Sequence, residues 1–146
     1  MRNTRKILII EDNPFNHDLY RAAFTAAGFD VDIREGADAH FIETVLAISP
    51  DIISMDLMIK EGGEGVPEDG FGVLALLKSD ERTRSIPVVV LTSFFEESKV
   101  VRARELGAVD FIALPGQSMQ KIADRYQEYL RDPKHYHPTH PLFHTA

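Results

Sequence analysis

The chain contains no cysteine and no long apolar run, and it carries fewer positive than negative charges. Without cysteine it has no disulfide framework, no thiolate nucleophile and no cysteine-ligated metal. The apolar run at residues 7–10 is too short for a membrane span or a signal peptide. The net charge of -7 argues against nonspecific binding to nucleic acids or acidic membranes, because phosphate groups require a basic surface.

The composition that remains is that of one ordinary domain. The 146 residues are enough to bury a single core, and hydrophobic residues make up 44%, a usual share for a globular protein. The lack of cysteine fits a reducing compartment. We therefore expect a soluble, cytoplasmic protein that makes no membrane contact.

Two short apolar segments end in acidic residues. The run at residues 6–10 predicts a buried strand followed by Glu11 and Asp12, and the run at residues 52–55 predicts another followed by Asp56. A carboxylate is costly in a core, but ligands bind at the carboxyl ends of strands in open parallel sheets. Asp56 is the expected chemical centre, although a solvated loop carboxylate would explain this residue if it stood alone.

Strand and helix patterns alternate along the chain. Further strands are expected at residues 29–34, 86–91 and 109–113, and helices at residues 14–27, 37–49, 70–78, 97–106 and 118–130. Alternation with short connections implies parallel strands and right-handed crossovers. The expected fold class is α/β: a flavodoxin-like, doubly wound, five-stranded parallel sheet of order 2-1-3-4-5, with helices on both faces. This order brings Glu11, Asp12 and Asp56 together.

The first predicted helix has a clear start and a clear end. Asn13 is a plausible N-cap before Pro14, and Gly28 closes the helix. The helical spacing of its apolar residues predicts which side faces the core. The expected buried face comprises Phe15, Leu19, Ala22, Ala23 and Ala26.

These motifs together resemble the receiver domain of two-component response regulators. The resemblance covers roughly residues 5–130 and is carried by the segments at residues 7–14, 50–58, 69–71, 86–92 and 105–112. Any one segment is a weak match, but all of them in order at near-family spacing form a strong signal. The resemblance implies a receiver domain at residues 1–131 and a C-terminal tail at residues 132–146.

The resemblance implies that Asp56 is a phosphoacceptor. It would take a phosphoryl group from a histidine kinase or phosphotransfer protein, and the chain would be no enzyme beyond its own phosphorylation and dephosphorylation. Three clustered carboxylates repel one another unless a cation compensates, and a hard divalent ion prefers oxygen ligands. The implied ligands of Mg²⁺, or of Mn²⁺, are Glu11, Asp12, Asp56 and the backbone carbonyl of Met58.

The resemblance also implies a pair of switch residues, Thr92 and Phe111. Thr92 would donate its hydroxyl to the phosphoryl group, and Phe111 would follow inward. The movement would change the face formed by the fourth helix, fifth strand and fifth helix, through which a downstream protein or a second copy could bind. The alternatives are a hydroxyl that caps the next helix for Thr92 and a plain core aromatic for Phe111.

Two departures from the family pattern stand out. Leu114 occupies the place of a lysine that contacts the phosphoryl group, and such a charged hydrogen bond is worth ~1.5–3 kcal/mol. Gly70 lies fourteen residues after Asp56, so the loop at residues 60–69 is longer than in the family. Lys60 in this loop could supply the missing ammonium, but a solvated loop lysine is the favoured interpretation.

The tail combines four histidines with several prolines. Imidazole groups suit zinc or nickel, but the spacing matches no defensible metal motif. A flexible or partner-contacting tail is the favoured interpretation. The histidines are His135, His137, His140 and His144.

The leading functional hypothesis is a stand-alone receiver that signals through a protein partner and contacts no nucleic acid directly. The alternative is a phosphorylation-independent pseudo-receiver that acts as a protein-binding module, which Leu114 and the long loop favour. A flavodoxin-like cofactor protein is a third possibility. It is disfavoured because a phosphate-cradling turn needs backbone donors and glycine or hydroxyl residues, whereas Glu11 and Asp12 would repel phosphate.

Overall fold

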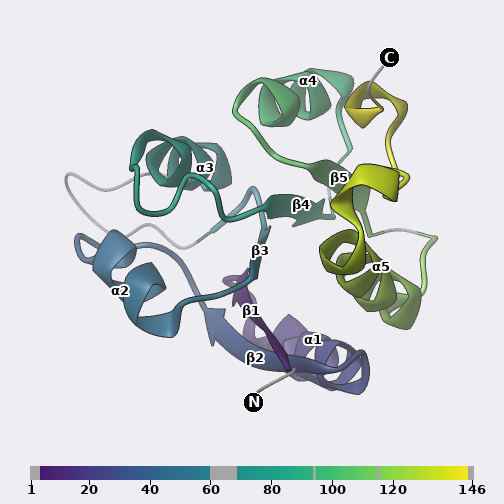
Figure 1. The fold of residues 1–146 in the computed structure, drawn as a ribbon, viewed down its shortest axis with the longest axis horizontal. Coiled ribbons are helices and arrows are strands. Elements are labelled where there is room, and N and C mark those ends of the chain that lie inside the picture. Colours follow the sequence, from purple (N-terminus) through teal and green to yellow (C-terminus); the bar gives the residue numbers. More distant parts are fainter. Residues whose placement is uncertain (1–3, 60–68, 94, 115, 145–146) are drawn as a thin grey trace.

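The computed structural model describes residues 4–59, 69–93, 95–114 and 116–144 (Figure 1). Strands and helices alternate, as the sequence patterns predict. The elements are β1 (Arg5–Ile10), α1 (Pro14–Ala26), β2 (Phe29–Arg34), α2 (Phe41–Ile48), β3 (Ile52–Met55), α3 (Gly70–Ser79), β4 (Val88–Thr92), α4 (Glu97–Glu105), β5 (Asp110–Ala113) and α5 (Met119–Arg131), followed by the short 3-10 helices η1 (Pro133–His135) and η2 (Pro141–Phe143). Among the described residues, no helix is long and apolar enough to cross a membrane.

All neighbouring strands of the sheet are parallel, and their order is β2-β1-β3-β4-β5. This confirms the predicted flavodoxin-like fold. Ile10 pairs with Met55, so β1 and β3 end side by side. The residues that follow these two strands therefore emerge at the same edge of the sheet, at the point where the strand order reverses.

The sheet is covered on both faces, which is why its central strands are continuously apolar. Leu8 and Ile10 face the side covered by α2, α3 and α4, whereas Ile7 and Ile9 face the side covered by α1 and α5 (Figure 1). Successive side chains of a strand point to opposite faces, so one apolar run serves two cores. Both cores hold the strand ends at the site in place.

Side chains at the helix starts supply the expected caps. The Asn13 side chain accepts a hydrogen bond from the Phe15 amide at 3.0 Å, which confirms the predicted N-cap of α1. The second helix is shorter than residues 37–49 because Asp38 accepts a hydrogen bond from the His40 amide at 2.9 Å. This local side-chain bond competes with helix formation. The predicted face of Ala37, Phe41, Val45 and Ile48 is nevertheless buried.

The predicted apolar face of α1 is partly wrong. Of the five predicted residues only Ala23 is buried: Phe15 is 90% exposed, Leu19 is 52% exposed, and Ala22 and Ala26 are exposed as well. The buried residues of the helix are Tyr20, Ala23 and Phe24. Phe24 packs edge-on against Tyr126 of α5, with the ring centroids 4.9 Å apart. The helix is rotated because it packs against both β2 and α5, which turns Phe15 and Leu19 toward solvent.

The structure also differs from the expected flexible tail. Residues 132–144 lie against α4, β5 and α5 (Figure 1). Leu142 and Phe143 pack against the apolar cluster on the α4 side of the sheet. The proline-rich composition thus marks a segment without regular helix that still has a defined place in the fold.

Candidate functional site

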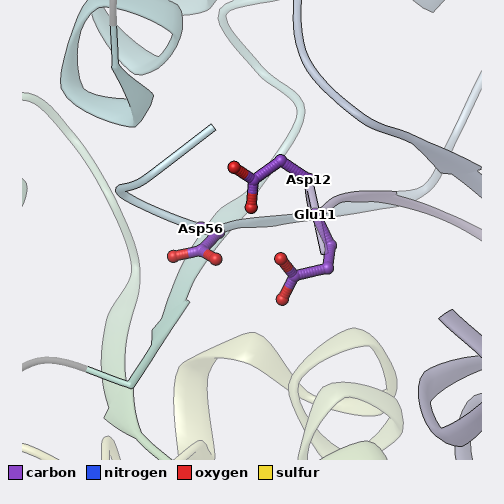
Figure 2. A group of neighbouring side chains, drawn as sticks. All are labelled: Glu11, Asp12 and Asp56. Carbon is purple, nitrogen blue, oxygen red and sulfur yellow. The ribbon is translucent and has the colours of Figure 1, made fainter. Parts of the chain in front are cut away.

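Three carboxylates meet at the edge where β1 and β3 end. Glu11 and Asp12 follow β1, Asp56 follows β3, and each offers one oxygen within 4.8 Å of the others. Figure 2 shows the three carboxyl groups directed toward a common space. In the described part of the chain, this is the one group of three or more potential metal ligands, so the tail histidines form no such cluster.

Glu11 is the buried member of the group, with 2% of its surface exposed. Its carboxylate accepts hydrogen bonds from the Asn13 amide and the Asn16 side-chain amide, both at 3.1 Å. A ring nitrogen of His17 donates to the Glu11 carbonyl oxygen at 2.7 Å. The first turns of α1 therefore hold Glu11 in place, as a buried carboxylate requires.

Burial of Asp56, and then the nearby negative charge of Glu11, raise its pKa to about 7. The Met58 amide donates to the Asp56 carboxylate at 3.3 Å, which opposes the shift without cancelling it. Burial and the contacts with Glu11 also raise the pKa of Asp12. A set of oxygen donors whose charges oppose one another fits a hard divalent cation such as Mg²⁺, which would restore their ionisation.

Gly70 allows α3 to begin directly against the turn that carries Asp56. A Cβ atom on this residue would lie 2.1 Å from the Asp56 carbonyl oxygen and 2.8 Å from the Leu57 Cα. The Gly70 amide donates to the Leu57 carbonyl at 3.0 Å, and Asp69 caps the helix by accepting from the Gly72 amide at 2.9 Å. Position 70 can therefore be occupied only by glycine without a backbone shift.

The structure places the two expected switch residues in the core. Thr92 ends β4 opposite Ala113 and is buried. Phe111 is buried in β5 and stands edge-on to Phe95, with the ring centroids 6.5 Å apart. Their burial fits either a moving pair or static core residues, so the switch role stays a prediction.

Leu114 and the extended loop mark the departures from the family pattern. The Leu114 amide donates to the Thr92 carbonyl at 2.9 Å, and its side chain packs against the apolar cluster under α1 and α5. This side chain offers neither a charge nor a donor. The predicted loop at residues 60–69 lies outside the described residues except for Asp69, and so does the alternative role of Lys60.

Two cations near the site were not predicted from the sequence. Lys99 and Arg102 of α4 line a cavity of about 450 Å³ together with Asp12 and Met58. The Arg102 guanidinium lies 4.5 Å from the centroid of the Phe71 ring, which also lines the cavity. The sequence did contain a signal for them: they lie on the helix that follows the strand ending in Thr92. This helix starts at the sheet edge that carries the carboxylates, so its first turns were expected to lie near the site.

Tyr20 is a further residue that sequence reasoning missed. Its hydroxyl is buried and makes no hydrogen bond to the described residues. Burial first, and then the negative charges of Glu11 and Asp56, raise the pKa of this phenol. Tyr20 therefore stays neutral and places a polar hydrogen near the two carboxylates from the core side.

Large apolar side chains are exposed close to the carboxylates. Phe15 begins the helix that follows Asp12, and Met58 lies two residues after Asp56; they are 90% and 55% exposed. Leu19, one helical turn after Phe15, is 52% exposed. Exposed apolar residues grouped beside a site are typical of a protein-docking surface.

Comparisons with known proteins agree with this geometry. The response regulator receiver domain family matches residues 7–126. The polar-differentiation response regulator DivK of Brucella ovis is 31% identical over 129 residues, which cover 88% of this chain and 98% of DivK. The BeF3-activated N-terminal receiver domain of Klebsiella pneumoniae RstA superposes with a TM-score of 0.71 at 25% identity, covering 87% of this chain and 99% of that domain's chain. The phosphorylated cyanobacterial phytochrome response regulator RcpA gives a TM-score of 0.71 at 24% identity, covering 89% of this chain and 96% of RcpA.

Proposed function

Since the chain belongs to the response regulator receiver domain family, we propose that it accepts a phosphoryl group on Asp56 from a histidine kinase or phosphotransfer protein. The observation that carries this proposal is the convergence of Glu11, Asp12 and Asp56, whose oxygens lie within 4.8 Å of one another. The match to DivK over 98% of its length supports a stand-alone regulator that signals through a downstream protein.

The proposed transfer is a substitution at phosphorus in which Asp56 is the nucleophile. One carboxylate oxygen forms the new P–O bond while the P–N bond to the donor imidazole breaks, and the imidazole keeps the electron pair. Asp56 must be ionised to attack, and its pKa of about 7 shows that burial, and then the neighbouring negative charge of Glu11, oppose ionisation. Neutralisation of the transferring phosphoryl oxygens is the chemistry that a bound Mg²⁺ or Mn²⁺ supplies. The residues that would hold it are Glu11, Asp12, Asp56 and Met58 through its backbone carbonyl.

The response to phosphorylation would pass through the end of β4 and the middle of β5. We expect Thr92 to donate its hydroxyl to the phosphoryl group and Phe111 to follow. Leu114 weakens this coupling because it offers no charged hydrogen bond. Lys99 and Arg102 bring positive charge to the cavity beside Asp12, which partly offsets the missing ammonium by long-range attraction.

The exposed residues beside the site fit the docking of a phosphodonor. A phosphohistidine must approach Asp56 closely, so the donor protein must contact the surface around the carboxylates. Phe15, Leu19 and Met58 supply apolar area at this surface. Clusters of buried aromatic and aliphatic anchors usually dominate the energy of such contacts.

A pseudo-receiver that binds proteins without phosphorylation is the second candidate, and Leu114 is the observation that favours it. In that case the acidic site would be a remnant or a simple cation site. A flavodoxin-like cofactor function has less support, since Glu11 and Asp12 stand where a bound phosphate would need hydrogen-bond donors.

Intact mass spectrometry after incubation with acetyl phosphate and Mg²⁺ tests the proposal. We expect one phosphoryl adduct on the wild type, none on Asp56→Asn, and an unchanged adduct on the control Asp80→Asn, whose partly exposed carboxylate follows α3 and pairs with Arg82. An adduct that survives Asp56→Asn would place the nucleophile elsewhere. No adduct with acetyl phosphate or with a histidine kinase donor would favour the pseudo-receiver.

A further inference from the structure

A buried carboxylate at the start of β5 depends on residues 132–144 for its hydrogen bonds. Asp110 is 0% exposed. It accepts from the Tyr136 hydroxyl at 2.5 Å, from the Thr139 amide at 2.9 and 3.0 Å, and from the His140 amide at 3.4 Å. Within its own strand it accepts from the Phe111 amide at 2.8 Å. A buried carboxylate needs such donors, so these contacts anchor the segment at residues 132–144, here called the strap.

The strap runs from α5 past β5 to α4 (Figure 1). On the α5 side, the Tyr136 ring stands edge-on to Tyr129 at 5.3 Å and lies 5.2 Å from the Arg125 guanidinium, which also donates to the His137 carbonyl. On the α4 side, the strap ends in η2, whose residues pack against that helix. The strap therefore covers surface on this face that a bound partner protein would otherwise contact.

The strap also contacts the residues next to Phe111. The His140 ring stacks on Phe95 with the centroids 5.9 Å apart, and its Nε2 lies 3.5 Å from the Glu97 carboxylate. Phe95 in turn stands edge-on to Phe111 at 6.5 Å. Phe111 is thus linked to the strap in two indirect ways. Its ring packs against Phe95, which contacts His140, and its neighbour in β5, Asp110, accepts hydrogen bonds from the strap.

We propose that the strap is an internal ligand of the α4–β5–α5 face and that phosphorylation of Asp56 releases it. This inference rests on the proposed function, because it needs Phe111 to move when the site is phosphorylated. A movement of Phe111 changes the packing of the Phe95 ring and the position of the Asp110 carboxylate. These two groups make the contacts that hold the strap. By thermodynamic linkage, a docked strap must then oppose the phosphorylated arrangement to the same degree.

The proposal explains why the face is closed in this structure. A protein that binds the α4–β5–α5 face must first displace the strap, so the output surface is available only after release. The strap leaves a cavity of about 580 Å³ against α4 and α5, lined by Arg104, Tyr129 and Phe143 among others, so it bridges the face without filling it. An occupant that is anchored at a few points can leave without unfolding the domain.

Hydrogen exchange in the full chain tests the proposal, with the Thr139 amide as reporter and beryllofluoride plus Mg²⁺ as the phosphoryl mimic. Without the mimic, we expect slow Thr139 exchange; with it, exchange should be about fivefold faster or more. Tyr136→Phe, which removes the hydroxyl donor, and His140→Ala, which removes the ring on Phe95, should each bind the mimic about fivefold more tightly than wild type. The control His135→Ala changes an exposed ring that pairs only with Asp132 among the described residues, and it should behave as wild type.

The possible failures can be told apart by fluorine NMR of the bound mimic. A bound mimic with unchanged Thr139 exchange would overturn the strap inference and leave the proposed function intact. Fast Thr139 exchange before any mimic is added would show that the strap is not docked and would also overturn it. If neither wild type nor the strap variants bind the mimic in the presence of Mg²⁺, the proposed function fails and this inference fails with it.

Discussion

At the residue scale, Asp56 is subject to two opposing requirements. In the proposed function it must be accessible and ionised to attack a phosphoryl group, yet it lies half-buried beside Glu11. Burial and like charge both favour the protonated form, which is why its pKa rises to about 7. A cation in the site removes this penalty, so the reactivity of Asp56 and the occupancy of the metal site are linked.

Without a divalent cation, the stability of the chain should fall as the pH rises from 4 to 8. Asp56 has a pKa of about 7 in the folded chain and 3.8 as its ordinary value, so the folded state holds a proton that the unfolded state releases in this range. We expect this residue to contribute about 1–3 kcal/mol to the loss, after allowance for partial solvation. Urea unfolding in EDTA at pH 5 and pH 8 measures it.

Asp56→Asn supplies the control for this pH dependence. The amide cannot titrate, so the variant should lose less stability than wild type between the two pH values, and the difference isolates Asp56 from Asp12. Saturating Mg²⁺ should reduce the wild-type loss, because the ion stabilises the ionised carboxylates. Identical pH slopes in wild type and Asp56→Asn would contradict the raised pKa.

Leu114 is the residue at which the coupling between phosphate and output can be strengthened. Leu114→Lys should tighten beryllofluoride binding by at most the ~1.5–3 kcal/mol of one charged hydrogen bond. The gain will be smaller where Lys99 and Arg102 already attract the anion. Titration monitored by fluorine NMR measures it, and Leu114→Met controls for a change of shape without charge. Equal binding by Leu114→Lys and Leu114→Met would show that position 114 does not reach the phosphoryl group.

At the scale of elements, the acidic site forms where the starts of α1 and α3 meet the carboxyl ends of β1 and β3. Asn13 caps α1 directly after Asp12, and Asp69 caps α3 beside the turn of Asp56. Both caps fix where the following helix begins, and so they fix the positions of the acidic residues. The close approach of α3 to the Asp56 turn depends on Gly70, because a side chain there would overlap the backbone.

Gly70→Ala should damage both stability and the metal site. Its Cβ would lie 2.1 Å from the Asp56 carbonyl oxygen, so α3 or the Asp56 turn must shift, at a cost of about 1–3 kcal/mol or more. Gly107→Ala is a matched control, because its φ of +100° also strains the backbone, but away from the carboxylates. Calorimetric titration with Mg²⁺ should show weakened binding for Gly70→Ala and unchanged binding for Gly107→Ala. Unchanged Mg²⁺ affinity in both variants would remove Gly70 from the site.

At the scale of the whole molecule, two surfaces face different partners. The mouth of the acidic site carries the exposed side chains of Phe15, Leu19 and Met58, whereas the α4–β5–α5 face is covered by the strap. We propose that a phosphodonor docks on the first surface and that the second becomes available on release of the strap. The arrangement separates the input from the output of the proposed signal.

Phe15→Ala should slow phosphotransfer from a protein donor without slowing it from acetyl phosphate. Phe15 is 90% exposed, so its removal leaves the fold and the carboxylates unchanged, and a small donor needs no docking surface. We expect roughly tenfold or greater loss with a histidine kinase or phosphotransfer protein, as for an interface anchor worth more than ~1.4 kcal/mol. Val101→Ala, on the exposed side of α4, is the control. Equal losses with both kinds of donor would mean that Phe15 supports the site itself.

The sequence by itself determined the strands, their order and the convergence of the acidic residues. Short apolar runs and the helical period of 3.6 residues are local properties, and the alternation of strands with helices leaves few allowed topologies. Asn13 as a cap and Gly28 as a stop depend only on neighbouring backbone groups, and the structure has both in these places. Glu11, Asp12 and Asp56 follow strands that the predicted order makes neighbours, so their meeting followed from topology.

Tertiary structure alone decided which side of α1 is buried, how close α3 approaches Asp56, and where the tail lies. Phe15 and Leu19 match a helical apolar stripe, but packing of α1 against β2 and α5 selects Tyr20 and Phe24 for the core instead. Asp110 shows no local sign of burial, and apart from the neighbouring Phe111 amide its donors come from residues 26 to 30 positions later in the chain. Non-local hydrogen bonds and packing produce no periodic pattern in a sequence. The docked position of the strap could therefore not be predicted from the sequence.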